Sequence, residues 1–590
     1  MVNVKNLFGM AVMATALVGC SSNDNLAPDG KDNVGKAGTA YAKFTIQLPT
    51  VSGTRAEGDP TPGTPSFEGG TANEYAVNDA QLVIFEKSGT STSEGDYTCV
   101  EHINIGNLEP WTDQNNQGVT RYANITAQLN GVSLDDKGKK YFALVILNNG
   151  SESKVELPKA GTTYSAWNVA AKAKTATAFL NSKNGFYMAN APKYVAGSVP
   201  TTLVPIKGVY STKAEAQNKP ATTVYVERGM AKVTIGSSTF DANKDVTTST
   251  NYDGDKVTIN SWTLDVLNKK TFPVHNTDGL SSIWNQDWAG RFFDNTSKDF
   301  KRVYWGIDPN YDLGLTGIAD CKGQFYLVDP SGATYNGETS STFTWSTKDE
   351  PLYCLENTFD INNMKQGQTT RVLFKATYTP AAVASQEDKT FFMIGNNPKI
   401  WTKDALVAQI TSKAKEMLKS EAVVVTINAK APLLKGGSHL LSAADVTIKD
   451  GEVDKTETFE YATLNTKLGL NNTEMDVNNT PKVGIKTYEN GECYYIARIK
   501  HFNELTPWVS GNPTYKDPLL TDAQNNEKFL GRYGVLRNNW YDLTVSKVSA
   551  PGYPDVPVVN PTEPDDEDTK FINVEVKILD WAKRSQSIEL

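Results

Sequence analysis

The stretch FINVEVKILDWAKRSQSIEL, residues 571–590, decides how the rest of the sequence is interpreted. In an extended strand, residues two apart point to the same face, and the first half of this stretch alternates apolar and polar residues. The alternation predicts a β-strand whose apolar face is formed by Ile572, Val574, Val576 and Ile578. Trp581 is out of phase with these residues, which predicts a bend or bulge and a second short strand through Ile588.

A proline-rich, acidic segment precedes this strand. Residues 551–569 include Pro554, Pro557, Pro561 and Pro564, and proline favours an open, extended chain over a packed one. We expect a tether that lets the apolar strand reach a groove on another molecule or an edge of its own domain. The sequence leaves both destinations open.

The composition favours β-structure and argues against a nucleic-acid partner. A chain of 590 residues is too long for one ordinary core. The 44 glycines, 25 tyrosines and 11 tryptophans favour strands joined by turns. A formal net charge of −9 does not suit a surface that binds phosphate backbones. We therefore expect two large β domains with few helices and no nucleic-acid partner.

The N-terminus resembles the signal of an exported lipoprotein. Lys5 provides a positive charge, and the apolar run at residues 7–18 is too short to span a bilayer in a mature protein. Leu-Val-Gly-Cys then ends the run at Cys20, in the pattern of a bacterial lipobox. This predicts a signal peptide at residues 1–19 and lipidation of Cys20, which would anchor the chain through acyl groups. The alternative is an ordinary signal peptide followed by a chance cysteine.

A second alternating strand lies near the N-terminus, and a loop open to proteases follows it. The strand is predicted by the alternating apolar residues Ala42, Phe44, Ile46 and Leu48. The following loop, residues 51–73, is rich in Gly, Pro, Thr and Ser and is therefore exposed to cleavage. It contains Arg55 and Ala56; on composition alone, Arg55 is a solvated loop residue.

The central chain divides into two predicted β-rich regions. In residues 56–226, compact apolar runs at 81–85 and 141–147 are typical of buried strands. In residues 227–549, strand patterns far outnumber helices. One amphipathic helix is predicted at residues 404–419, with Thr402 as its N-cap.

The sequence lacks a recognisable catalytic or metal-binding motif. It has no H-E-x-x-H, G-x-S-x-G, P-loop or G-x-G-x-x-G pattern in a suitable context. Residues 241–245 begin like a calcium loop, but Val246 and Tyr252 stand where that motif needs Gly and Glu. No C-x-x-C spacing suggests zinc, and we expect free, buried thiols at Cys99, Cys321, Cys354 and Cys493. We predict no enzymatic activity, cofactor or metal site.

Several motifs, in order along the chain, give a resemblance to a known family. They are the lipobox at Cys20, V-x-V-E-R-x-x-A-K-V at 224–233, YCLENT at 353–358, VLRNNWY at 535–541, and the ending from Val574 to Leu590. Together they resemble the fimbrillin family of Bacteroidia, the subunits of type V pili. Within that family, the major subunits of short fimbriae are the most similar.

The resemblance implies a fold and a maturation scheme. The fold is two transthyretin-like β-sandwich domains, residues 56–226 and 227–549, with minor helices and a linker and donor-strand tail at 550–590. A lipidated propeptide, residues 20–55, would be removed by an arginine-specific protease between Arg55 and Ala56. The emptied groove would then accept the tail strand of another subunit by β-augmentation.

The same resemblance implies location and partners. The precursor would be a lipoprotein at the outer membrane, and the mature subunit would form a cell-surface fimbria that supports adhesion. The expected partners are identical or related subunits, the protease, and host or bacterial surface receptors. The alternative is an accessory or tip fimbrillin, or a surface adhesin lipoprotein, that binds glycans or host proteins. Trp284, Trp288 and Trp305 are candidates for stacking on glycans, although core packing is expected for most of them.

Overall fold

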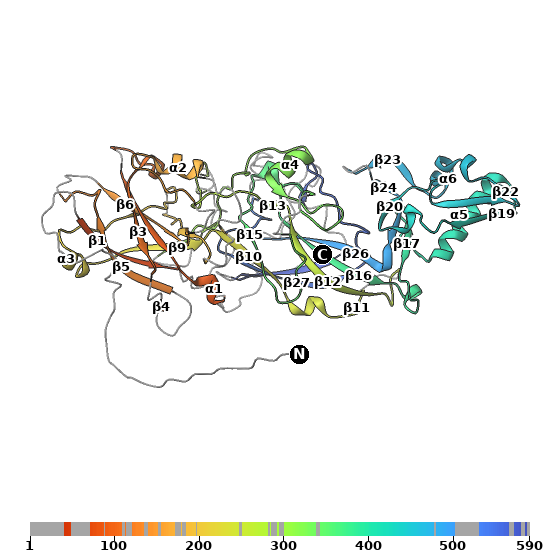
Figure 1. The fold of residues 1–590 in the computed structure, drawn as a ribbon, viewed down its shortest axis with the longest axis horizontal. Coiled ribbons are helices and arrows are strands. Elements are labelled where there is room, and N and C mark those ends of the chain that lie inside the picture. The colour runs from red at the N-terminus through yellow and green to blue at the C-terminus, as the bar shows by residue number, and fades with distance from the viewer. Residues whose placement is uncertain are drawn as a thin grey trace, which may run out of the picture.

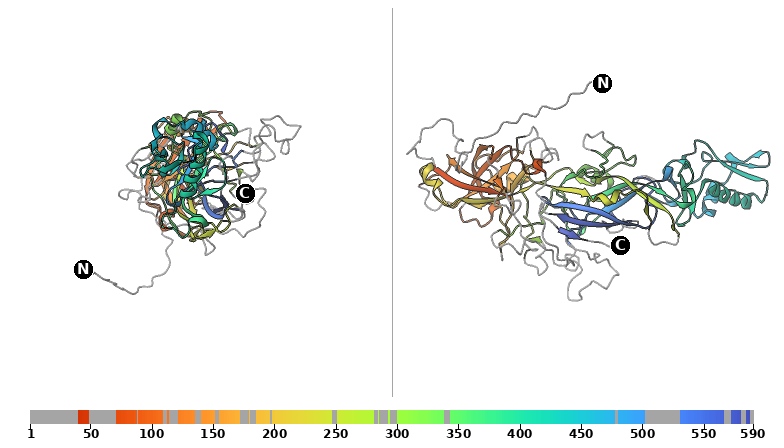
Figure 2. Two further views of the ribbon diagram at one scale, coloured as in Figure 1. Left: turned by 90° about the vertical axis from the view of Figure 1, so that its right-hand side faces the viewer. Right: turned by 90° about the horizontal axis from the view of Figure 1, so that it is seen from below.

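The chain folds into an elongated row of three parts, which Figures 1 and 2 show along the long axis of the molecule. We call them the N-terminal domain (residues 40–228), the central domain (230–379 and 492–586) and the distal lobe (391–488). The computed structural model describes residues 40–48, 71–87, 89–108, 112–113, 121–134, 140–150, 155–171, 179, 185–195, 198–246, 251–280, 284, 292–293, 300–337, 343–476, 480–501, 530–565, 572–579 and 584–586.

The N-terminal domain is a β-sandwich formed by one continuous strand order, β3-β2-β6-β7-β9-β1-β5-β4, with β8 paired to β6. The side chains of β1 and β5 pack against those of β2 and β6 in one apolar core. Its strands are β1 (Ala40–Gln47), β2 (Ala80–Glu86), β3 (Thr98–Gly106), β4 (Thr112–Asp113), β5 (Arg121–Leu129), β6 (Tyr141–Leu147), β7 (Met188–Asn190), β8 (Val204–Pro205) and β9 (Thr222–Arg228). Its helices are α1 (Ala72–Tyr75), α2 (Tyr164–Ala170) and α3 (Lys213–Gln217).

The central domain is also a sandwich. One sheet has the order β15-β10-β27-β28-β29, the other β11-β12-β16-β26, and β13 pairs with β14. Val233 and Leu543 of the first sheet share a core with Trp262 and Phe374 of the second. The elements are β10 (Met230–Ile235), β11 (Lys244–Asp245), β12 (Lys256–Asp265), β13 (Leu267–Asn268), α4 (Ile318–Gln324), β14 (Phe325–Tyr326), β15 (Leu352–Leu355), β16 (Arg371–Thr379), β26 (Glu492–Arg498), β27 (Trp540–Val548), β28 (Ile572–Leu579) and β29 (Arg584–Gln586).

The distal lobe is inserted between β16 and β26, which pair directly with each other. It has an apolar core of its own, into which Leu406, Ile410 and Ala414 of α5 pack. Thr402 caps this helix, because its Oγ1 accepts a hydrogen bond from Ala405 N at 3.2 Å. The elements are β17 (Phe391–Ile394), β18 (Ile400–Trp401), α5 (Lys403–Leu418), β19 (Val423–Ile427), β20 (Gly437–His439), β21 (Val446–Asp450), β22 (Val453–Asp454), α6 (Tyr461–Lys467), β23 (Asn471–Met475), β24 (Pro481–Val483) and β25 (Ile485–Tyr488).

The mainly β fold with minor helices agrees with the sequence prediction, and the predicted helix is α5. Cys99, Cys321, Cys354 and Cys493 are free and buried, also as predicted. Burial raises the pKa of Cys354 and of Cys493 to about 12. Both thiols are therefore un-ionised at neutral pH, and a reactive role is not indicated.

The proline-rich segment before the tail differs from the open tether that its composition predicts. Up to Asp565, where its description stops, it is largely buried against the central domain. Tyr553 exchanges two backbone hydrogen bonds of 2.8 Å with Tyr494 of β26, and Arg371 donates to Pro557 O at 2.6 Å. The prolines suit this path because their missing N–H groups leave no donor to satisfy in the interior.

A buried network of charged groups joins the N-terminal and central domains where β9 continues into β10. Glu227 Oε2 accepts from Arg302 at 2.9 Å, and Glu227 Oε1 lies 2.8 Å from His275 Nδ1. Burial alone raises the pKa of Glu227, but Arg302 and His275 outweigh it and lower the pKa. Arg302 also donates to Arg537 O at 3.0 Å. Residues of the 224–233 and 535–541 motifs therefore form this junction.

Candidate functional site

The predicted N-terminal strand is present as β1, in the interior of its sheet beside β5 and β9 (Figure 1). It pairs antiparallel with β5 from Ala40 to Gln47 and parallel with β9 from Phe44 to Gln47. Where β9 does not reach, Tyr41 exchanges two backbone hydrogen bonds of 2.8 Å with Tyr210. Strand β1 is therefore held by ladder hydrogen bonds on both sides.

The apolar face of β1 is built into the domain core. Ala42, Phe44 and Ile46 are fully buried and Leu48 is 6% exposed, whereas the residues between them are half-buried. Phe44 lies opposite Ile125 of β5, and its neighbours in the core include Ile84 and Val145. Removal of β1 would uncover this apolar slot, which we call the β1 slot, between β5 and β9.

A short strap, residues 210–217, holds the strand from outside. It contains α3, which contacts both β1 and β5, and Lys43 Nζ donates to Gln217 O at 3.0 Å. Thr212 caps α3 by accepting from Glu215 N at 3.1 Å. Sequence reasoning missed this strap. The Thr-x-x-Glu pattern at its start is the signal that indicates a short helix there.

Strand β1 has a single covalent connection to the residues that form its slot. That connection runs through residues 49–70, which contain Arg55 and Ala56 and lie outside the described residues. One cut there leaves β1 attached only by non-covalent contacts. The predicted lipidation site, Cys20, also lies outside the described residues, so its modification and the cleavage both stay predictions.

The predicted tail strand is present as β28. Its backbone pairs antiparallel with β27, with Val576 opposite Leu543 and Ile578 opposite Tyr541, and a register shift follows Val545. The predicted second strand is β29, which pairs with β28. Of the two destinations that the sequence left open, this structure contains the one on the tail's own domain. Strands β1 and β28 belong to different sheets, so the structure does not bring the two candidate strands together.

Two of the tryptophans considered for glycan stacking belong to the interior. Trp305 is fully buried and Trp284 is 5% exposed, and both pack in a cluster with Phe292 and Leu536. Trp288 lies outside the described residues. For Trp284 and Trp305, core packing is therefore the correct interpretation.

Neither a metal site nor a membrane-spanning helix is found in the described part of the chain. No group of three or more His, Cys, Asp or Glu side chains there could hold a metal ion. No helix in it is long and apolar enough to cross a membrane.

The comparison with protein families identifies the region that ends with the tail. Residues 486–587 match the family described as major fimbrial subunit protein type IV, fimbrillin, C-terminal. This region of the chain is similar to the C-terminal region of fimbrillins. This fimbrillin region begins in β25 and includes β26, β27, β28 and β29. The predicted resemblance to fimbrillins is thereby confirmed.

Among solved structures, the chain is similar to three proteins of Parabacteroides distasonis. Two are candidate cell adhesion proteins, with 11% and 10% identity, TM-scores of 0.34 and 0.32, and coverage of 92% and 93% of this chain and 100% and 99% of theirs. The third is a fimbrial assembly protein with 12% identity, a TM-score of 0.24, and coverage of 58% of this chain and 96% of its own. Because the TM-scores are low, these likenesses establish neither fold nor function. No curated protein matches the chain.

Proposed function

We propose that this chain is a structural subunit of a cell-surface fimbria that matures by loss of β1 and polymerises by donor-strand exchange. The subunit is exported as a lipoprotein through Cys20 to the outer membrane and cut between Arg55 and Ala56. The fimbrillin region supports a role in a surface appendage, structural rather than enzymatic, with other fimbrial subunits as partners. The observation that carries the proposal is that β1 is buried and paired on both sides, yet has one covalent connection to its slot, through the segment that contains Arg55.

The tail has the pattern needed to replace β1. Both strands place four apolar residues at every second position, from Ala42 to Leu48 and from Ile572 to Ile578. Burying the four tail residues at about 1.5–3 kcal/mol each stabilises the joint by very roughly 6–12 kcal/mol, before ordering costs are subtracted. The contact joins unlike surfaces of two subunits, so it extends into a filament and does not close.

The exchange also changes which strands of a domain body pair with the tail. In this structure, β28 pairs with one strand of the domain body, β27. In the β1 slot it would pair with two, β5 and β9. Strands β28 and β29 pair with each other and can leave together, so only the ladder between β27 and β28 has to break, whereas β1 is held by ladders to both β5 and β9.

Deletion of residues 571–590 tests the donor role. The precursor keeps its folded N-terminal domain, and cleavage with an arginine-specific protease still cuts after Arg55. We expect no fibres by electron microscopy, because the slot finds no donor. Fibres formed as abundantly as by the full chain would reject the tail as donor.

The pairing of the tail with its own domain favours a second candidate function. A chain whose tail stays on β27 would be an accessory or tip fimbrillin, or a lipid-anchored surface adhesin, with glycans or host proteins as ligands. In that case the cell-surface protein retains Cys20 and β1. Mass spectrometry of the N-terminus of the surface-exposed protein distinguishes the two, because the fimbrial subunit begins at Ala56.

A further inference from the structure

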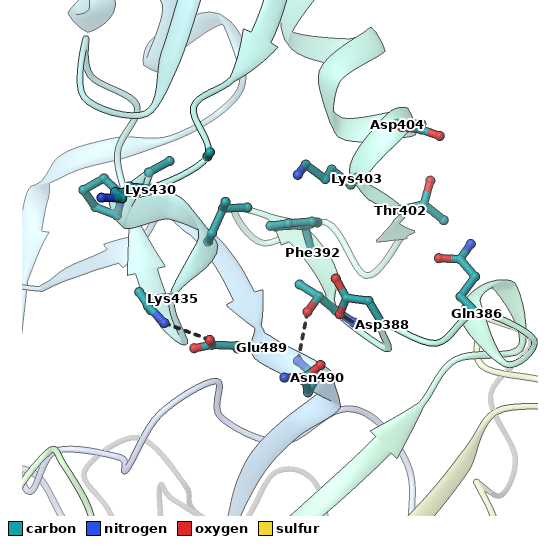
Figure 3. A pocket seen from close by; sticks show the side chains of 15 residues that line it. Gln386, Asp388, Phe392, Thr402, Lys403, Asp404, Lys430, Lys435, Glu489 and Asn490 are labelled. Carbon is teal, nitrogen blue, oxygen red and sulfur yellow. Dashed lines mark hydrogen bonds and ion pairs between the residues drawn. The ribbon is translucent and has the colours of Figure 1, made fainter.

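A polar cavity of about 720 Å³ lies at the neck between the distal lobe and the central domain (Figure 3). The two chain segments that cross this neck, residues 386–390 and 489–490, form one side of it. The start of α5 and the loop 429–435 form the other. The cavity is thus built where an inserted lobe meets its host domain, and its size suits a small ligand.

The charges that line the cavity balance each other. Three lysines, Lys403, Lys430 and Lys435, line it together with three carboxylates, Asp388, Asp404 and Glu489. Glu489 is paired with a lysine of the wall, and Asp388 is stabilised in its ionised form by groups of the wall. Lys435 Nζ lies 3.0 Å from Glu489 Oε1, and hydrogen bonds from Thr390, together with the charge of Lys403, lower the pKa of Asp388. A ligand with net charge of either sign would meet like charges here.

The rest of the wall combines uncharged polar side chains with a few apolar ones, among them Phe392 and Leu434. Gln386 and Asn490 supply side-chain amides, and the backbone of Asn490 is held by a hydrogen bond of 2.9 Å from its N to Thr390 Oγ1. Thr402, which caps α5, also lines the cavity. Amides and ammonium groups donate hydrogen bonds, while carboxylates and amide oxygens accept them, so the wall offers both kinds at short intervals.

From this balance of charge and this mixture of donors and acceptors, we infer that the neck cavity binds a neutral oligosaccharide. A sugar hydroxyl is both donor and acceptor, so a polyhydroxylated, uncharged ligand can satisfy such a wall without a charge of its own. An apolar ligand would leave the polar wall groups without partners. The inference does not depend on polymerisation, because the whole cavity belongs to one chain.

The first test fills the cavity without disturbing the core. Ala429 lines the cavity and is exposed, so Ala429→Trp occupies the space and removes no buried contact. Ala422→Trp is the matched control, since Ala422 is exposed on the same lobe and does not line the cavity. The uncleaved chain and both variants are applied to a printed panel of neutral galactose-, mannose- and N-acetylglucosamine-terminated oligosaccharides and their sialylated counterparts.

We expect the unmodified chain and Ala422→Trp to bind a neutral member of the panel, and Ala429→Trp to bind it at least about tenfold more weakly. Lys430→Ala, with Lys449→Ala as control, repeats the test by removing a donor if Ala429→Trp does not fold. Absence of binding by the unmodified chain, binding of sialylated members only, or equal binding by the cavity variants and their controls would overturn the inference. Loss of fibre formation has no bearing on these outcomes.

Discussion

At the residue scale, the apolar side chains of β1 are fully buried and lie upstream of the proposed cut. Phe44 is fully buried in the apolar core of the N-terminal domain. If the strand is discarded on maturation, a change at Phe44 affects the precursor and not the fibre. A residue with an ordinary core role would affect both forms.

Phe44→Ala is therefore expected to lower the free energy of unfolding of the precursor by about 3–5 kcal/mol, because it leaves a cavity in the core. Urea unfolding of the uncleaved chain measures this loss. Fibres assembled from the variant should dissociate in denaturant at the same midpoint as fibres of the unmodified chain. A fibre that is weakened as much as the precursor would show that β1 remains in place.

The contribution of Asp308 to the free energy of unfolding of the central domain depends on pH. Burial raises the pKa of its carboxyl to about 7, even though Thr358 N, Asn310 N and the Asn268 side chain donate to it at 2.6–2.8 Å. A carboxyl whose pKa is higher in the folded state stabilises the fold at low pH, and this contribution is lost as the pH rises through that value.

Between about pH 5 and pH 8, Asp308 is expected to reduce the free energy of unfolding by roughly 3 kcal/mol. Asp308→Asn is expected to remove this decrease of the unfolding free energy with pH. The expectation holds whether the substitution raises or lowers the stability at a single pH. Denaturant unfolding at several pH values measures the slope. The exposed Asp312→Asn serves as control and should leave it unchanged; an Asp308→Asn slope equal to that of the unmodified chain would contradict the assignment.

At the scale of elements, the strands and helix with strong periodicity could be predicted from sequence. Strand β1, the tail strand and α5 each follow from the spacing of their own apolar residues, which is local information. Sequence could not predict the strap around α3, the packed proline-rich segment or the neck cavity. They depend on contacts such as Lys43 with Gln217 and Tyr494 with Tyr553, which join residues far apart in the chain.

The strap should control how fast β1 leaves after cleavage. Thr212→Ala removes the cap of α3 and destabilises the strap by about 1 kcal/mol, which predicts roughly fivefold faster release of the β1 peptide. Mass spectrometry of the released peptide over time measures the rate. Thr163→Ala removes the equivalent cap of α2 and is the matched control; equal rates for the two variants would exclude the strap as a gate.

At the scale of the whole molecule, the buried charges at the β9–β10 junction hold two domains as one body. Glu227, His275 and Arg302 are each at most 2% exposed. Removing Glu227 or Arg302 leaves the other as a buried charge without its counter-charge. The junction lies between the β1 slot of one domain and the tail of the other, so it connects the acceptor slot and the donor tail of each subunit in the proposed fibre.

Glu227→Gln is expected to cost about 3–5 kcal/mol of unfolding free energy because Arg302 loses its buried counter-charge. Glu492→Gln, which removes a half-exposed partner of Lys375, should cost no more than about 1 kcal/mol. Thermal unfolding followed by calorimetry compares the two. Similar losses would show that the junction cluster is not a structural connection.

The composition of purified fibres tests the central claim most directly. Mass spectrometry of subunits recovered from fibres should find Ala56 as the N-terminal residue, the tail intact through Leu590, and no peptide that contains residues 40–48. Fibre subunits that retain β1, either as an uncleaved chain with lipidated Cys20 or as a bound peptide after cleavage at Arg55, would contradict the replacement of β1 by a neighbour's tail.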